Sequence, residues 1–78
     1  MRYYFHLRQS DGYVVDEEGL ELGGMDAVIT AATLGARSLI AGDALDGRLP
    51  LGSIIEVDDE NGGRVLELPF ADTVLLER

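Results

Sequence analysis

The sequence contains no cysteine, no lysine and no tryptophan. Without cysteine the chain forms neither a disulfide bond nor a thiolate metal site. No apolar run approaches the 18 residues that would indicate a membrane-spanning helix. The N-terminal apolar run is too short for a signal sequence, so we expect a cytoplasmic protein by default, with which the lack of cysteine is compatible. The net negative charge disfavours anionic membrane surfaces, so we expect no membrane partner.

Basic residues are also scarce, which gives the chain a strongly negative charge. Six arginines face 15 acidic residues, for a formal net charge of −9. Such a field repels a phosphate backbone, so we expect no nucleic-acid partner. An acidic surface keeps a chain soluble and attracts basic proteins, which leaves a basic protein partner open.

The length of 78 residues predicts a single small domain over residues 1–78. A chain of this size buries only about 60% of its unfolded surface, so it is expected to be marginally stable alone. A thin domain gains stability from a partner that completes its core. A homo-oligomer is therefore one expected state.

Apolar residues near the N-terminus indicate a first β-hairpin. Its strands are expected at residues 2–8 and 13–16, joined by a turn at 9–12. Residues 20–22 alternate and predict a short third strand or an extended arm.

Helical spacing of apolar residues predicts one helix from Met25 to about Ala41, with Gly42 at its left-handed stop. The leucines that follow are expected to pack under the helix end: Leu45, Leu49 and Leu51. The buried stripe of the helix is expected to comprise Met25, Ile29 or Val28, Ala32, Ala36, Leu39 and Ile40.

A second hairpin is predicted at residues 53–57 and 64–70, around an acidic turn at 58–63. The tail at 71–78 is expected to extend a strand or to form a helical turn. This element order predicts an α+β fold, in which an antiparallel ββαββ sheet is packed on one face by a single helix.

Alternation along the strands divides their side chains between two faces. Because one helix covers only one face, the other is expected to meet water or another chain. The facing of residues 13–16 stays open, since Tyr13 and Val15 compete with Val14. The helix-covered face is expected to hold Phe5, Leu7, Ile55, Val57, Leu66, Leu68 and Phe70. The candidate interaction face is expected to hold Tyr4, His6, Arg8, Glu56, Val65 and Glu67.

Motifs for catalysis or cofactor binding are missing. His6 is the single histidine, and the sequence shows no triad or zinc pattern around it. We expect it to pair across the sheet with Glu56 or Glu67, and the alternative is a pH-sensitive or hydrogen-bonding residue on the exposed face. The acidic turn at 58–63 fails the calcium-loop template, because Val57 and Leu68 take its first and twelfth positions. We therefore expect no catalytic residue, no cofactor and no metal site, and not an enzyme. Weak metal binding by the acidic turns stays open.

Three segments carry a family resemblance. They are Arg2–Leu7, the turn Asp16–Gly19 and Leu68–Asp72. With Met25-Asp26-Ala27 opening the helix, the chain resembles an uncharacterised family of short bacterial proteins, catalogued as a domain of unknown function. The resemblance implies a fold and a size, and no site residues.

These observations favour a non-enzymatic protein-interaction domain that self-associates through the uncovered sheet face or an edge strand. The alternative is a regulatory protein that masks a basic partner. The element order is loosely similar to small antitoxins with a partial ribonuclease-H-like fold, which makes an antitoxin-like inhibitor one form of this alternative. A small enzyme is the third alternative.

Overall fold

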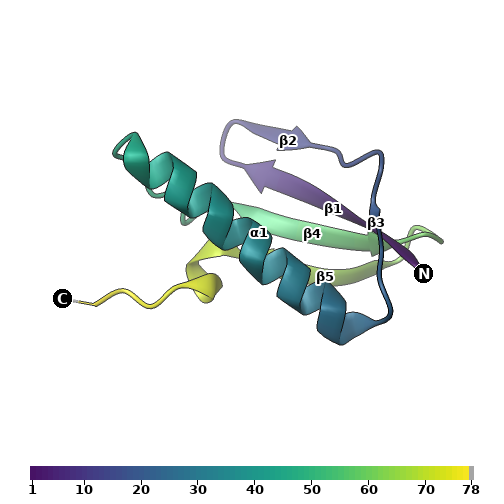
Figure 1. The fold of residues 1–78 in the computed structure, drawn as a ribbon. Coiled ribbons are helices and arrows are strands. Elements are labelled where there is room, and N and C mark those ends of the chain that lie inside the picture. The colour runs from purple at the N-terminus through teal and green to yellow at the C-terminus, as the bar shows by residue number, and fades with distance from the viewer. Residues whose placement is uncertain (78) are drawn as a thin grey trace.

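The computed structural model describes residues 1–77 and confirms the α+β fold with a single α-helix on an antiparallel sheet (Figure 1). The helix lies between the two hairpins in sequence, in the order ββαββ with one short additional strand. The elements are β1 (Arg2–Gln9), β2 (Gly12–Val14), β3 (Leu20–Glu21), α1 (Met25–Leu45), β4 (Ile54–Asp59), β5 (Arg64–Pro69) and the 3₁₀ helix η1 (Phe70–Thr73).

The sheet runs in the order β2-β1-β4-β5, and every pair is antiparallel. Its centre is the pairing of β1 with β4, in which His6 lies opposite Glu56. β2 and β3 pair with different parts of β1: Leu7 lies opposite Val14, and Tyr3 lies opposite Leu20. The predicted third strand is thus confirmed, and residues 15–19 connect it to β2.

α1 packs its small side chains onto the sheet. Val28, Ala32, Ala36 and Ile40 are buried and meet the apolar side chains of β1, β4 and β5, with Phe70 from η1. The predicted helical period is correct, but the buried stripe is narrower than predicted, because Met25, Ile29 and Leu39 are exposed. The helix-covered face of the sheet is confirmed: Ile55, Val57 and Phe70 are core residues, and Phe5, Leu7, Leu66 and Leu68 pack against them.

The predicted end of α1 at Gly42 is wrong, because the helix continues to Leu45. The left-handed residue is Gly47, with φ of 81°, and the backbone N–H groups of Asp46 and Gly47 donate to the last turn. A glycine inside a helix costs only about 1 kcal/mol, so the later Asp-Gly pair sets the stop. Leu45 and Leu49 are 90% and 58% exposed, so they do not pack under the helix end.

The second hairpin contains a β-bulge. Val57 pairs with Leu66 and Asp58 pairs with Arg64, which leaves Val65 as an extra residue in β5. In the turn that follows β4, the Asp59 carboxylate accepts the N–H groups of Asn61 and Gly63 at 2.9 Å each.

The tail begins as a helical turn, in agreement with one of the two expectations for it. η1 covers residues 70–73, and Arg37 Nε of α1 donates to the Thr73 carbonyl at 2.7 Å. Of the predicted tail 71–78, Arg78 lies outside the described residues.

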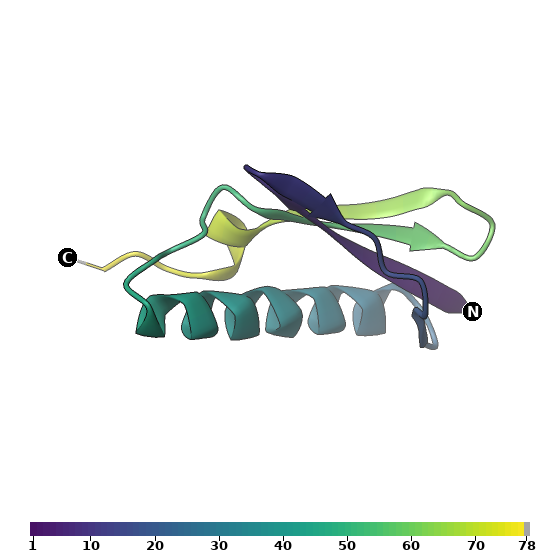
Figure 2. The same cartoon turned by 90° about the horizontal axis from the view of Figure 1, so that it is seen from above.

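The molecule has two layers, with α1 on one side and the sheet on the other (Figure 2). α1 runs diagonally across the sheet and passes η1 before it ends, and β2 lies at one edge of the sheet (Figures 1 and 2). By length and composition alone α1 would be able to cross a membrane, but a core helix meets the same criteria, and here α1 packs on the sheet.

Candidate functional site

The face of the sheet opposite α1 carries a polar network centred on Glu56. The Glu56 side chain is only 5% exposed, and its carboxylate receives a two-point contact from Arg8, with Nε to Oε2 at 2.9 Å and Nη2 to Oε1 at 3.2 Å. Arg64 approaches from the other side, with Nη1 at 3.5 Å from Oε1. The guanidinium of Arg8 also lies over the Tyr13 ring, 4.5 Å from its centroid.

His6 joins this network through Asp58, which also contacts Arg64. The backbone N–H of Asp16 donates to its Nδ1 at 3.1 Å, and its Nε2 lies 3.3 Å from Asp58 Oδ2. An Nδ1 that accepts a hydrogen bond carries no proton, so the neutral ring has its hydrogen on Nε2, facing Asp58. Both ring nitrogens are therefore occupied by structural contacts.

Burial and pairing shift the acidities in this network. The hydrogen bond from Arg8 lowers the pKa of Glu56, although burial opposes the shift. Burial raises the pKa of Tyr13, and the neighbouring Glu56 carboxylate adds to this shift. The Asp58 contact raises the pKa of Arg64. Pairing thus favours the charged forms of Glu56 and Arg64, and burial favours the protonated form of Tyr13.

Four of the six predicted face residues meet in the network: His6, Arg8, Glu56 and Glu67. His6 and Glu56 were expected to be exposed but are 9% and 4% exposed, because neighbouring side chains and the 15–19 connection lie over them. His6 lies opposite Glu56 in the strand register, as expected, but the two side chains do not pair. Its ring contacts Asp58 instead of a glutamate.

The prediction for Val65 is wrong. It is half-buried and packs against the core, because the bulge breaks the alternation in β5. The same bulge places Arg64 with Glu67, at 3.3 Å, which the strict alternation had missed. Tyr4, the sixth predicted residue, is half-buried beside Gly19. Tyr13 was recognisable as a neighbour of Arg8 only from the hairpin register.

The connection between β2 and β3 is built around Asp16. Its carboxylate accepts the N–H groups of Phe5 at 3.0 Å and of Glu18 and Gly19 at 3.1 Å each. Burial opposes its negative charge, but these three hydrogen bonds outweigh burial and lower the pKa of Asp16. Gly19 has φ of 70°, and a Cβ there would lie 2.8 Å from the Tyr3 carbonyl oxygen. The connection therefore has a fixed shape.

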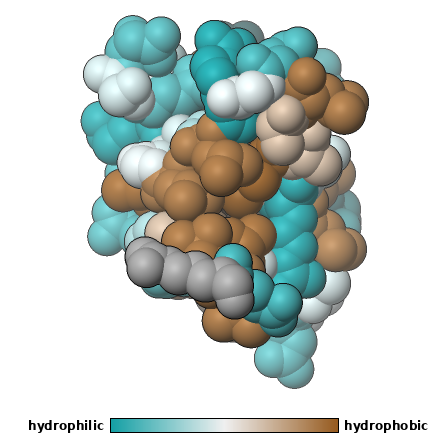
Figure 3. All heavy atoms as spheres, turned by 90° about the vertical axis from the view of Figure 1, so that its left-hand side faces the viewer, coloured by the Kyte–Doolittle hydropathy of each residue, from teal (hydrophilic) through white to brown (hydrophobic). Residues whose placement is uncertain are grey.

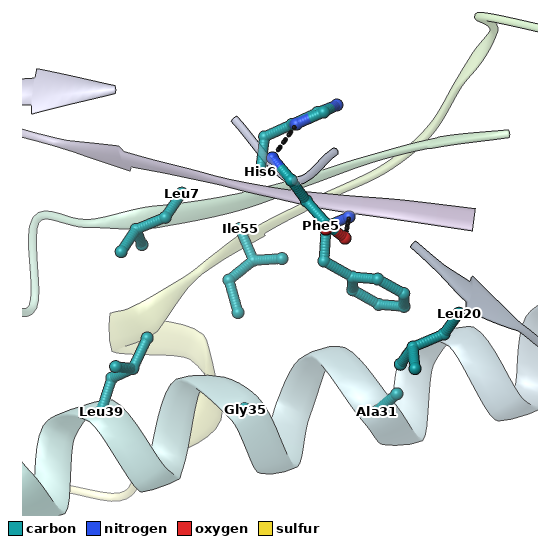
Figure 4. Close-up of a pocket in the computed structure, with 9 residues that line it drawn as sticks. Phe5, His6, Leu7, Leu20, Ala31, Gly35, Leu39 and Ile55 are labelled. Atoms are coloured by element: carbon teal, nitrogen blue, oxygen red, sulfur yellow. Dashed lines mark hydrogen bonds between the residues drawn. The ribbon is translucent and has the colours of Figure 1, made fainter. Parts of the chain in front are cut away.

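On the other face of the sheet, an apolar groove opens between α1 and β1 (Figure 4). We call it the edge groove. Phe5, Leu7 and Ile55 point from the sheet toward α1, while His6 points away (Figure 4). The groove has a volume of about 280 Å³. Its lining residues are Phe5, His6, Leu7, Asp16, Leu20, Ala31, Gly35, Leu39 and Ile55.

The side of β2 that faces the α1 layer is exposed beside this groove. Val14 lies opposite Leu7 in the hairpin, so it shares the α1 side of the sheet, yet it is 55% exposed. Leu20 and Leu39, at the two ends of the groove, are 50% and 45% exposed. Apolar surface thus continues from the floor of the groove onto the underside of β2.

Acidic residues adjoin the lining of the groove and a separate hollow. Glu17 and Glu18 follow the lining residue Asp16, and a polar hollow near the end of α1 is lined by Asp11, Asp43 and Arg48, among others. Within residues 1–77, no ion pair involves Asp11, Glu17, Glu18 or Asp43, which are exposed or half-exposed. The rim of the edge groove therefore has a negative charge excess.

A second apolar surface lies at the end of the molecule where α1 stops and the C-terminal segment lies (Figure 3). Four leucines in these segments are strongly exposed: Leu45 at 90%, Leu49 at 58%, Leu75 at 81% and Leu76 at 68%.

A family model for a domain of unknown function, DUF6894, matches residues 2–71. The chain belongs to this family. The resemblance predicted from the sequence is thus confirmed. No curated protein and no solved structure matches the chain.

The DUF6894 match begins in β1 and ends in η1, so it includes the Glu56 network, the Asp16 connection and the edge groove. Within the described residues the structure gathers no group of three or more histidine, aspartate or glutamate side chains that could hold a metal ion. Membership of DUF6894 assigns no function to either face, so the function rests on the site itself.

Proposed function

We propose that this chain is a non-enzymatic protein-interaction domain that binds a segment of a partner protein in the edge groove. The observation that carries the proposal is the apolar groove of about 280 Å³ beside α1, continued by the exposed underside of β2. Concave apolar surface of this kind is typical of sites that receive a partner's side chains.

The opposite face supports this choice by contrast. Its charges are already paired with one another, and no buried side-chain nitrogen or oxygen within residues 1–77 lacks a hydrogen-bond partner. A partner would have to displace these contacts to gain its own, which costs free energy for every charge left unpaired. The occupied nitrogens of His6 also support a structural role for this residue instead of acid–base catalysis.

The test is selection from a random peptide library against the folded domain, followed by binding to two variants. Ala31→Phe fills the groove, whereas Thr30→Phe places the same ring on the exposed adjacent position, which does not line the groove. Circular dichroism establishes that both variants fold. Peptides that lose binding to Ala31→Phe but keep it with Thr30→Phe support the proposal. Peptides that bind both variants equally, or an unenriched library, refute it.

Self-association is a second candidate, favoured by the leucines at the α1 end of the molecule. Leu45, Leu49, Leu75 and Leu76 lie in segments that reach this end, and two copies that meet there would bury like against like. Light scattering at high micromolar concentration tests this candidate. A dimer that becomes monomeric with Leu45→Glu and Leu76→Glu supports it, and a strict monomer excludes it.

A further inference from the structure

We propose that the edge groove receives a basic amphipathic helix of a partner protein, which lies beside α1 under β1 and β2 as the second helix of the layer. This inference rests on the proposed function and names the partner's chemistry. Its three supports are the width of the sheet, the small residues along α1 and the charge of the rim.

The width of the sheet requires more than one helix to cover it. Neighbouring strands lie about 4.8 Å apart, while a helix with its side chains is about 10 Å across and thus covers about two strands. α1 packs mainly against η1 and β5. Tyr3 and Phe5 of β1 still reach the core, but β2 and the flank of β1 beside it have no helix beneath them. β2 lies at the edge of the sheet, beyond β1 (Figure 1). The vacant place therefore has the width of one helix.

The side of α1 that faces this vacant place carries small residues. Ala31 and Gly35 line the groove, and even a methyl group added at Gly35 would come no closer than 3.8 Å to Ile55. Small residues allow two helix backbones to approach closely. From Ala31 to Leu39 the flank is about 12 Å long at 1.5 Å per residue, which matches two to three turns of a docked helix.

The rim determines the charge of the partner. Glu17 and Glu18 follow the lining residue Asp16, and Asp11 and Asp43 line a polar hollow near the end of α1 together with Arg48, so acidic residues outnumber this arginine. A helix with apolar residues on its inner face and lysine or arginine on its outer face satisfies both the floor and the rim. The chain's net charge of −9 acts in the same direction at longer range.

A second copy of this chain fits the groove poorly. The stripe of its α1 that has helical spacing is already buried on its own sheet, which leaves only Met25, Ile29, Leu34, Leu39 and Leu45 as large exposed apolar residues of that helix, and η1 has only four residues. A second copy would also bring another charge of −9 to an acidic rim. An added strand is equally unsuited, because β2 offers an edge of only three residues.

The experiment uses three synthetic helical peptides of about 14 residues, with leucine at positions i, i+3, i+7 and i+10. Their outer faces carry lysine, glutamine or glutamate, and nothing else differs. Fluorescence anisotropy measures the dissociation constant of each peptide for the full chain at low and high salt. We expect the lysine peptide to bind about tenfold more tightly than the glutamine peptide, an advantage that high salt removes, and the glutamate peptide to bind weakest.

Matched charge variants localise the effect. Glu17→Gln with Glu18→Gln removes two rim charges and should weaken the lysine peptide about threefold to tenfold, without changing the glutamine peptide. Asp72→Asn with Glu77→Gln removes two charges from the η1 side and should change neither. Ala31→Phe should abolish binding of all three peptides.

The outcomes separate the two proposals. If the glutamine peptide binds as tightly as the lysine peptide, and Ala31→Phe blocks both, the groove binds helices but the basic partner is refuted. If no peptide binds, or if Ala31→Phe has no effect on binding, the helix inference and the groove proposal both fail. A dimer in light scattering that Ala31→Phe makes monomeric would identify a second copy as the occupant and overturn the inference.

Discussion

Gly19→Ala is the substitution whose effect the structure specifies most closely. Gly19 lies in the left-handed region with φ of 70°, where an alanine costs about 1–2 kcal/mol. Its Cβ would stand 2.8 Å from the Tyr3 carbonyl oxygen and 3.0 Å from both Arg2 Cγ and Tyr4 Cε1. Because the first neighbour is backbone of β1, relief requires the connection to move, at a further cost of about 1–3 kcal/mol.

The total loss is about 2–5 kcal/mol, less about 0.4–1 kcal/mol for the reduced entropy of the unfolded chain. A domain of this size has a free energy of unfolding of about 4–12 kcal/mol, so the variant is expected to lose a large fraction of it. Urea denaturation followed by circular dichroism measures the loss.

Gly47→Ala is the matched control. Gly47 also has a left-handed φ, of 81°, but nothing lies within 4 Å of its added Cβ. The control therefore contains the backbone strain and the unfolded-state entropy without the collision. Gly19→Ala should lower the urea midpoint by at least about 1 M more than Gly47→Ala, for an m-value near 1 kcal/mol per M. Equal midpoints would refute the close approach of Gly19 to β1.

Three further predictions concern the contacts that hold the sheet and its flanks. Asp16→Ala removes the acceptor of three backbone N–H groups and should cost about 2–4 kcal/mol, with faster hydrogen exchange at the Phe5 amide. Because the folded-state pKa of Glu56 is lowered from its ordinary value of 4.5, its contribution is complete above that value and is lost as the pH falls through the folded-state pKa. Glu56→Gln should therefore flatten the acid limb of stability against pH, and an unchanged limb would contradict the pairing. Arg37→Ala removes the hydrogen bond to the Thr73 carbonyl and should increase proteolysis within residues 70–77, with little change in the far-ultraviolet spectrum.

The fold was predictable from the sequence because its signals are local. Alternation in the strands and helical spacing in α1 identify the core face, and both hairpin turns are marked by glycine. The end of α1 was missed because Gly42 and Gly47 both resemble a stop, and only the backbone conformation at Gly47 separates them. The exposure of Leu45 and Leu49 follows from the longer helix.

The sites were harder to predict because they depend on register and layer geometry. Alternation placed His6 and Glu56 on one face, but their burial depends on Arg8, Arg64 and the Asp16 connection, which lie far apart in sequence. The bulge at Val65 cannot be read from alternation, because it is the point where alternation stops. The edge groove depends on which half of the sheet α1 covers, and no local pattern encodes that choice.

Both edges of the sheet are interrupted, and this limits the surface on which aggregation can begin. Along the outer edge of β1, β2 pairs with residues 7–9, the Asp16 carboxylate takes the N–H of Phe5, and β3 pairs with residues 2–3. On the opposite edge, β5 carries a bulge and ends in Pro69, which has no N–H to donate. Neither edge offers the long, flat run of free backbone groups on which amyloid-like stacking grows. A chain with much apolar surface is thereby protected against fibril formation by the shape of its strands.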